Sequence, residues 1–153
     1  MIALYITSMG ESAGKSALCV ALGRIFKENG WNVGYLKPIA IVAEKAEVGD
    51  KDAEFIKHAL GLEEPVELLC PVSLNAKDFL ASVNDKEPPW LKKAEGVFAQ
   101  VTQGKDGVLV EGVSGFKKGS DEALTGSRII KALGAKSILI VSYDSNLQAS
   151  QIE

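Results

Sequence analysis

Histidine and cysteine are scarce in this chain of 153 residues, which has one histidine, His58, and two cysteines, Cys19 and Cys70. The cysteines lack the CxxC spacing and the neighbouring histidines of a zinc site, and two thiols are too few for a disulfide framework. A zinc site and a disulfide framework are therefore both disfavoured. We expect the cysteines to pack in the core, because free cysteine is among the most buried residue types, and His58 to be a surface or packing residue.

An excess of basic residues is also missing. The chain has 17 lysines and arginines against 20 aspartates and glutamates, which gives a formal net charge of −3. It offers no basic field that would attract nucleic-acid phosphates or anionic lipid, so we expect no nucleic-acid partner. The apolar run at residues 2–7 is short and has no basic region before it, so we expect no signal peptide, no membrane span and a cytoplasmic location.

Short apolar runs instead alternate with amphipathic stretches. Strands are predicted at 2–7, 31–36, 107–112 and 136–142, and the first, third and fourth of them are expected to be buried. Helices are predicted at 15–28, 51–60 and 88–102 and in a stretch that ends at Gly134. The segment 62–86 is broken by two prolines and stays unresolved, although its residues 68–74 could form an edge strand or a packed loop. This alternation is typical of an α/β fold with a doubly wound, mostly parallel sheet and helices on both faces.

The chain is long enough for one domain, and 46% of its residues are hydrophobic, which suffices for a core. We therefore expect a single domain over residues 1–153. Residues 145–153 have the pattern of a helix start, with Ser145 or Asn146 as the N-cap, but the chain stops before that helix could finish. We expect a domain truncated at its C-terminal end, or the front part of a longer protein.

The segment GESAGKS, residues 10–16, joins the first strand to the first helix. Unpaired N–H groups and the helix dipole favour an anion at such a place. Glycines let the backbone wrap around phosphates, the lysine reaches the terminal phosphates, and the hydroxyl after it can bind Mg²⁺. The predicted nucleotide-binding residues are Gly10, Glu11, Ser12, Ala13, Gly14, Lys15, Ser16 and Ala17. The common spacing has glycine where this chain has Met9, so a glycine-containing turn with a solvated lysine is the alternative.

Three charged residues are predicted to lie near this loop, because the carboxyl ends of parallel strands share one edge of the sheet. Asp52, near a helix start, and Glu111, at the end of a buried strand, are candidate Mg²⁺ ligands together with Ser16. Asp52 could instead cap its helix, whereas a buried Glu111 needs a partner. Lys37 could bind a phosphate or a substrate carboxylate, or be a solvated lysine at a strand end.

Four segments, 4–39, 50–56, 106–115 and 135–141, resemble in their order dethiobiotin synthetase and its relatives. The greatest likeness is to the dethiobiotin-synthetase-like N-terminal domain of some phosphate acetyltransferases and of DRTGG-domain proteins. The resemblance implies a P-loop α/β fold, a homodimer, and ATP and Mg²⁺ as cofactors. It also implies Ser16, Asp52 and Glu111 as the metal set and Lys15 and Lys37 as catalytic cations.

The sequence departs from the synthetases at the substrate side of the site. Ile41 stands where serine is expected, and the family's VEGAGG stretch is replaced by VEGVSGFKKGSD. Three functions therefore stay open. The first is a Mg-ATP-binding domain that serves as a regulatory N-terminal module of a larger protein. The second is an ATP-dependent synthetase that activates a carboxylate or carbamate by phosphoryl transfer. The third is a non-catalytic interaction domain with a degenerate phosphate loop.

Overall fold

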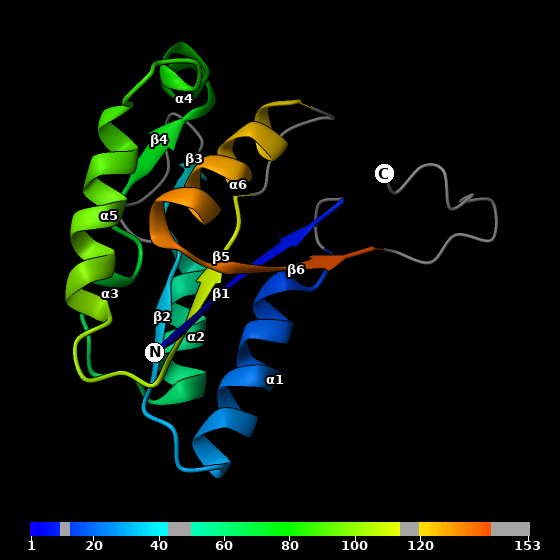
Figure 1. Cartoon of the computed structure of the whole chain (residues 1–153), viewed down its shortest axis with the longest axis vertical. Helices are drawn as coiled ribbons and strands as arrows, with labels where there is room; N and C mark the ends of the chain where they lie inside the picture. Colours follow the sequence, from blue (N-terminus) through cyan, green and yellow to red (C-terminus); the bar gives the residue numbers. More distant parts are fainter. Residues whose placement is uncertain (10–12, 43–49, 114–119, 142–153) are drawn as a thin grey trace.

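The computed structural model describes residues 1–9, 13–42, 50–113 and 120–141, with only the backbone for residues 120–124 (Figure 1). Their elements are β1 (Ile2–Ser8), α1 (Lys15–Glu28), β2 (Val33–Leu36), β3 (Ala40–Val42), α2 (Lys51–Leu60), α3 (Val66–Leu69), β4 (Ser73–Asn75), α4 (Ala76–Ser82), α5 (Pro89–Val101), β5 (Gly107–Glu111), α6 (Ser120–Leu133) and β6 (Lys136–Ile140). The predicted helix start in residues 145–153 lies outside the described residues.

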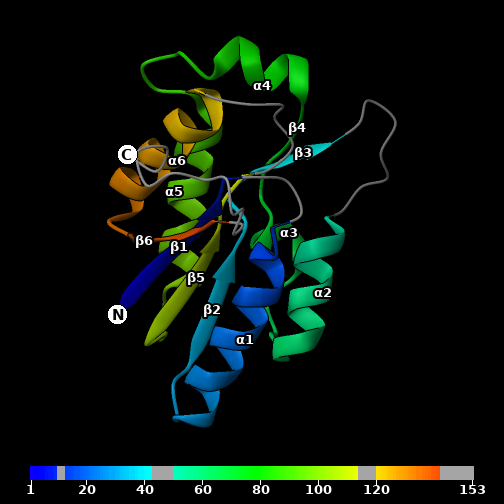
Figure 2. The same ribbon diagram turned by 90° about the vertical axis from the view of Figure 1, so that its right-hand side faces the viewer.

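The main sheet has four parallel strands in the order β2-β5-β1-β6. Strands β1 and β2 are joined through α1, and β5 lies between them. Their carboxyl ends therefore meet at one edge, as in other α/β proteins. Figure 2 shows α1 and α2 on one side of these strands and α5 and α6 on the other. This arrangement confirms the predicted fold class, an α/β fold with a mostly parallel sheet and helices on both faces.

Each face of the sheet has its own hydrophobic core. Neighbouring residues of one strand point to opposite faces, so Tyr5 belongs to the core beneath α5 and α6, and Ile6 to the core beneath α1 and α2. Strand β5 is buried on both faces, as a central parallel strand should be. The cysteines are both free and buried, as predicted, with Cys19 in α1 and Cys70 after α3. His58 is exposed on α2, also as predicted.

One detail of the predicted elements is wrong. The strand at 136–140 was expected to be buried, but it is the last strand of the described sheet and is half exposed, with Leu139 at 47%. In α1, the apolar residue Ile25 is 51% exposed. The helix instead buries Cys19 and Gly23. Gly23 has no side chain, and so the side chain of Leu60 from α2 can pack directly against it.

The segment 62–86 contains three short elements that its prolines obscured. Pro65 precedes α3, and β4 follows Pro71 and leads directly into α4. Strand β4 pairs in parallel with β3 to form a second sheet of two strands. Figure 2 shows this small sheet and α4 beyond the carboxyl edge of the main sheet. Within the described part of the chain, no helix is both long and apolar enough to cross a membrane.

Gly112, directly after β5, is predicted to be intolerant of any side chain. Its N–H donates to the Ile6 carbonyl oxygen at 2.8 Å, and an added Cβ would lie 2.9 Å from that oxygen. We expect Gly112→Ala to lower the free energy of unfolding by about 1–3 kcal/mol, because backbone must move. Gly96→Ala in α5 is the control, since its Cβ meets nothing within 4 Å and alanine favours a helix. Denaturant unfolding should show a lower free energy of unfolding than wild type for Gly112→Ala and a higher one for Gly96→Ala. A Gly112→Ala protein as stable as wild type would contradict the close packing.

Candidate functional site

Helix α1 begins directly after Gly14, whose φ of 88° lies in the left-handed region. Residues with a side chain rarely adopt this conformation, so glycine is required for the chain to turn into the helix here. Among the described residues, no side chain caps this helix start. The first N–H groups of α1 therefore keep their hydrogen-bonding capacity for an anion, and the helix dipole adds partial positive charge.

A cavity of about 260 Å³ opens at this helix start. It is lined by Ala13, Gly14, Lys15, Ser16, Ala17, Asp52 and Glu111. The described part of the predicted phosphate loop and both predicted carboxylates thus lie around one space. The other predicted loop residues, Gly10, Glu11 and Ser12, lie outside the described residues.

Lys15 lines this cavity and is buried, with 5% of its surface exposed. Its Nζ donates to Ser8 Oγ at 3.0 Å, at the end of β1. Within the described residues Lys15 forms no salt bridge. An ammonium whose partner in the described part of the chain is one hydroxyl is poorly compensated there, because ammonium groups are costly to bury without an anion. The alternative of a solvated lysine in a glycine-containing turn is therefore wrong for Lys15.

Glu111 ends β5 and is 2% exposed. Its Oε1 accepts from Ser16 Oγ, and its Oε2 accepts from the Tyr35 hydroxyl, both at 2.8 Å. These are the partners that a buried carboxylate requires. Burial, together with the nearby charge of Asp52, still raises the pKa of Glu111 above its ordinary value, although the two hydrogen bonds and Lys37 act in the opposite direction. Burial, followed by the charge of Glu111, also raises the pKa of Tyr35, so the phenol stays protonated and donates.

The raised pKa of Glu111 predicts a specific pH dependence. Folding makes this carboxyl bind its proton more tightly, so its contribution to stability is greatest below its ordinary pKa of 4.5 and is lost as pH rises through the raised pKa. Glu111→Gln has no such ionisation. The Tm of the variant minus that of the wild type should therefore increase from pH 4 towards neutrality in thermal unfolding. A Tm difference that is constant or decreases with pH would contradict the raised pKa of Glu111.

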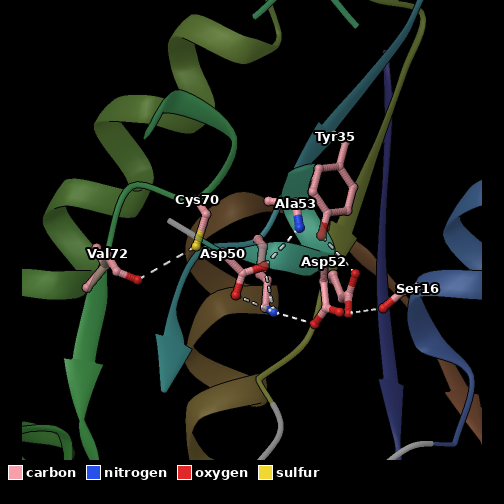
Figure 3. Close-up of polar contacts among 9 residues, drawn as sticks. Ser16, Tyr35, Asp50, Asp52, Ala53, Cys70 and Val72 are labelled. Carbon is pink, nitrogen blue, oxygen red and sulfur yellow. Dashed lines mark hydrogen bonds and ion pairs between the residues drawn. The ribbon is translucent and has the colours of Figure 1, made fainter. Parts of the chain in front are cut away.

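Lys37 follows β2 at the same edge and is only 5% exposed, so the alternative of a solvated lysine is wrong. Its Nζ donates to both oxygens of Asp50, at 3.0 and 2.8 Å, and to Asp52 Oδ2 at 2.8 Å (Figure 3). Burial opposes its charged form, but the two carboxylates outweigh burial, and the pKa of Lys37 is raised. The N-cap of α2 is Asp50, whose Oδ1 accepts from Ala53 N at 2.8 Å. Asp52 is thus no cap; its side chain is 54% exposed and lies beside the cavity.

Comparison with known proteins identifies the family of this chain. A family profile described as "AAA domain" matches residues 3–152. An "ATP-dependent dethiobiotin synthetase BioD" from Methanococcus vannielii is 30% identical over 73% of this chain and 51% of its own length. The proteins of the same name from Ralstonia nicotianae and Brachyspira hyodysenteriae are 28% and 25% identical, each over 90% of this chain and over 62% and 64% of their own lengths.

The chain belongs to a dethiobiotin-synthetase-like family of P-loop proteins. It spans roughly half to two thirds of the length of these curated relatives. The predicted phosphate loop lies between β1 and α1 of this family member. The departures at Ile41 and after Gly112 concern other segments; Ile41 lies in β3, and residues 114–119 lie outside the described residues.

The side chains around the cavity suit a hard divalent cation. Ser16, Asp52 and Glu111 offer a hydroxyl and two carboxylates, and Mg²⁺ in phosphate sites takes one or two carboxylates and completes its shell with water and phosphate oxygens. In the described part of the chain, no three His, Cys, Asp or Glu side chains group as a metal site. A cation here would therefore depend on phosphate oxygens for part of its shell, which fits a nucleotide-associated ion.

Sequence reasoning missed two residues of this network, Asp50 and Tyr35. Asp50 directly precedes the helix start in the pattern DKDA, and an aspartate there is the common N-cap, so the signal was present. Tyr35 lies two residues before Lys37, on a strand that was predicted but not placed in register with β5. Its link to Glu111 across 76 positions depends on strand pairing, which the sequence pattern of two separate strands does not determine.

Proposed function

We propose that this chain binds Mg²⁺-ATP in the cavity at the start of α1. The observation that carries the proposal is that Lys15 and Ser16 border one cavity at an uncapped helix start together with Asp52 and Glu111, which lie far from them in the sequence. The family relationship supports it, because the curated relatives carry the name of an ATP-dependent enzyme.

Each predicted residue has a role in this proposal. The backbone of Gly10, Glu11, Ser12, Ala13, Gly14 and Ala17 would surround the phosphates, and Lys15 would neutralise the terminal ones. Ser16, Asp52 and Glu111 would hold the cation, which when bound neutralises charge on the phosphate oxygens. Nucleotide binding would also supply Lys15 with the anion that its buried position calls for.

Thermal unfolding with and without Mg²⁺-ATP tests this proposal. Ligand at a hundred times its dissociation constant stabilises a protein by about 2.7 kcal/mol. For a domain of this size that corresponds to a rise in Tm of roughly 5–10 °C. No rise at millimolar Mg²⁺-ATP would refute the proposal and favour an interaction domain with a degenerate phosphate loop.

We further propose that the chain is the N-terminal nucleotide-binding module of a larger, homodimeric protein, of the kind that precedes phosphate acetyltransferase and DRTGG domains. The departures at Ile41 and after Gly112 support a regulatory role over a synthetase role. Analytical ultracentrifugation with and without Mg²⁺-ATP would test both the dimer and its dependence on nucleotide. A monomer under both conditions would refute the dimer.

A synthetase activity is the second candidate, and the position of Lys37 favours it. This buried cation is held by carboxylates beside the phosphate cavity, where a substrate carboxylate or carbamate could take the place of the half-exposed Asp52. Lys15 and Lys37 would then stabilise the charge on the phosphoryl group as it passes from ATP to the substrate oxygen, with ADP leaving. Phosphate release that depends on an added carboxylic or amino acid would support this activity; binding without release would favour the regulatory module.

A further inference from the structure

We infer that Tyr35 is a positioning residue for the cation that accompanies the nucleotide, because its hydroxyl fixes the carboxylate of Glu111 from within the sheet. This inference depends on the proposed function, since it concerns the same cavity. It goes beyond that function by assigning a role to a residue that touches neither the cavity nor the nucleotide. Tyr35 is absent from the residues that line the cavity, so its effect must pass through Glu111.

The pairing of two strands places the tyrosine beside the glutamate. Tyr35 in β2 is the register partner of Leu109 in β5. Side chains alternate along a strand, so Glu111 points to the same face as Leu109, one step nearer the carboxyl edge. Tyr35 and Leu109 both belong to the core beneath α1 and α2. The phenol ring, which is fully buried, therefore extends along that face, and its hydroxyl meets Glu111 Oε2 at 2.8 Å (Figure 3).

Glu111 is held from two sides by unlike donors. Ser16 contacts Oε1 from the solvent-accessible cavity side, as a member of the phosphate loop. Tyr35 contacts Oε2 from the closed core side, and its ring is fixed by packing. If the Ser16 hydroxyl oxygen binds a cation, the position of that hydroxyl, and so its hydrogen bond to Glu111, depends on the cation. The hydrogen bond from the Tyr35 hydroxyl does not depend on the ligand and therefore fixes the orientation of the Glu111 carboxylate, as groups that hydrogen-bond to metal ligands commonly do.

Tyr35→Phe removes the hydroxyl and keeps the ring. The test measures the dissociation constant of ATP in the 153-residue chain by calorimetry, once with Mg²⁺ and once with EDTA. Groups behind metal ligands typically contribute 10- to 100-fold to metal affinity. We therefore expect Tyr35→Phe to reduce the Mg²⁺-dependent gain in ATP affinity by about tenfold or more and to leave affinity in EDTA unchanged.

Tyr5→Phe is the matched control, because Tyr5 is also a buried tyrosine of the main sheet but belongs to the opposite core. A general loss of packing or stability would affect both variants alike. The inference predicts that Tyr5→Phe keeps the wild-type gain from Mg²⁺. An unchanged gain in Tyr35→Phe, or an equal loss in both variants, would overturn the role of Tyr35 while leaving nucleotide binding intact. A wild-type chain that binds no ATP would overturn the proposed function itself, and the inference with it.

Discussion

Asp50→Ala is expected to be the most destabilising single substitution among the site residues, lowering the free energy of unfolding by about 3–5 kcal/mol. Asp50 accepts two hydrogen bonds from the buried Lys37, at 3.0 and 2.8 Å, and also caps α2 through Ala53 N. Loss of the cap alone costs about 1 kcal/mol. The larger part arises because a buried ammonium is left, among the described residues, with the half-exposed Asp52 as its partner.

Asp52→Ala provides the matched control, since both aspartates contact the same Lys37 Nζ at 2.8 Å. Asp52 is 54% exposed and Asp50 is 11% exposed, so solvent screens the Asp52 pair, and its loss should cost at most about 1 kcal/mol. Chemical denaturation of the two variants should separate them clearly. Equal costs, or a larger cost for Asp52→Ala, would show that Asp50 is not the principal partner of Lys37.

The pH dependence of the Asp50 effect has a definite sign. The raised pKa of Lys37 means that its stabilising contribution is fully present below the ordinary value of 10.5 and is lost only as pH rises beyond it. The wild type should therefore keep this contribution between pH 7 and pH 10. In Asp50→Ala burial acts on Lys37 without its principal partner, so any change of the stability difference in this range should come from the variant becoming relatively more stable as pH rises. A difference that grows as pH rises would contradict a charged, paired Lys37.

Lys15→Ala is expected to abolish the stabilisation by Mg²⁺-ATP. Hydrogen bonds to charged groups contribute about 1.5–3 kcal/mol each, and this lysine would neutralise the most highly charged part of the ligand in a partly buried place. We expect at least about a hundredfold loss of affinity from two such contacts. The free protein should not lose stability to a similar degree, because Lys15 has no ion pair among the described residues to lose.

Lys27→Ala serves as the control for this prediction. Lys27 lies at the other end of the same helix, is exposed, and donates to the Leu60 carbonyl oxygen. Its removal takes the same charge from α1 without changing the cavity. Thermal unfolding with Mg²⁺-ATP should show the wild-type rise in Tm for Lys27→Ala and none for Lys15→Ala. Equal rises in both variants would exclude Lys15 as a phosphate ligand.

Elements with a clear beginning and end were predictable from the sequence. Helices α1 and α2 match the predicted bounds, because Gly30 and Gly61 follow them with the positive φ that ends a helix. The short elements between 62 and 86 were not predictable, because elements of three to seven residues carry too little periodicity. Strand β3 is held by pairing with β4, which neither segment reveals alone.

The site was predictable to the extent that it depends on the ends of strands. Glu111 and Lys37 were predicted at the carboxyl edge from topology alone, and the structure places them there. The hydrogen-bond partners of Glu111 and Lys37 were harder to predict. Which aspartate holds Lys37 depends on how far the α2 start lies from β2, and the contact of Tyr35 with Glu111 depends on the register of β2 and β5. Such distances arise from tertiary packing, which a local pattern does not contain.

Direct titration of the chain with Mg²⁺-ATP by calorimetry tests the central claim, that the cavity at the start of α1 is a nucleotide site. We predict saturable binding at one site per chain, weaker in EDTA and lost in Lys15→Ala. Absence of binding at millimolar Mg²⁺-ATP, or binding that Lys15→Ala leaves unchanged, would contradict the claim.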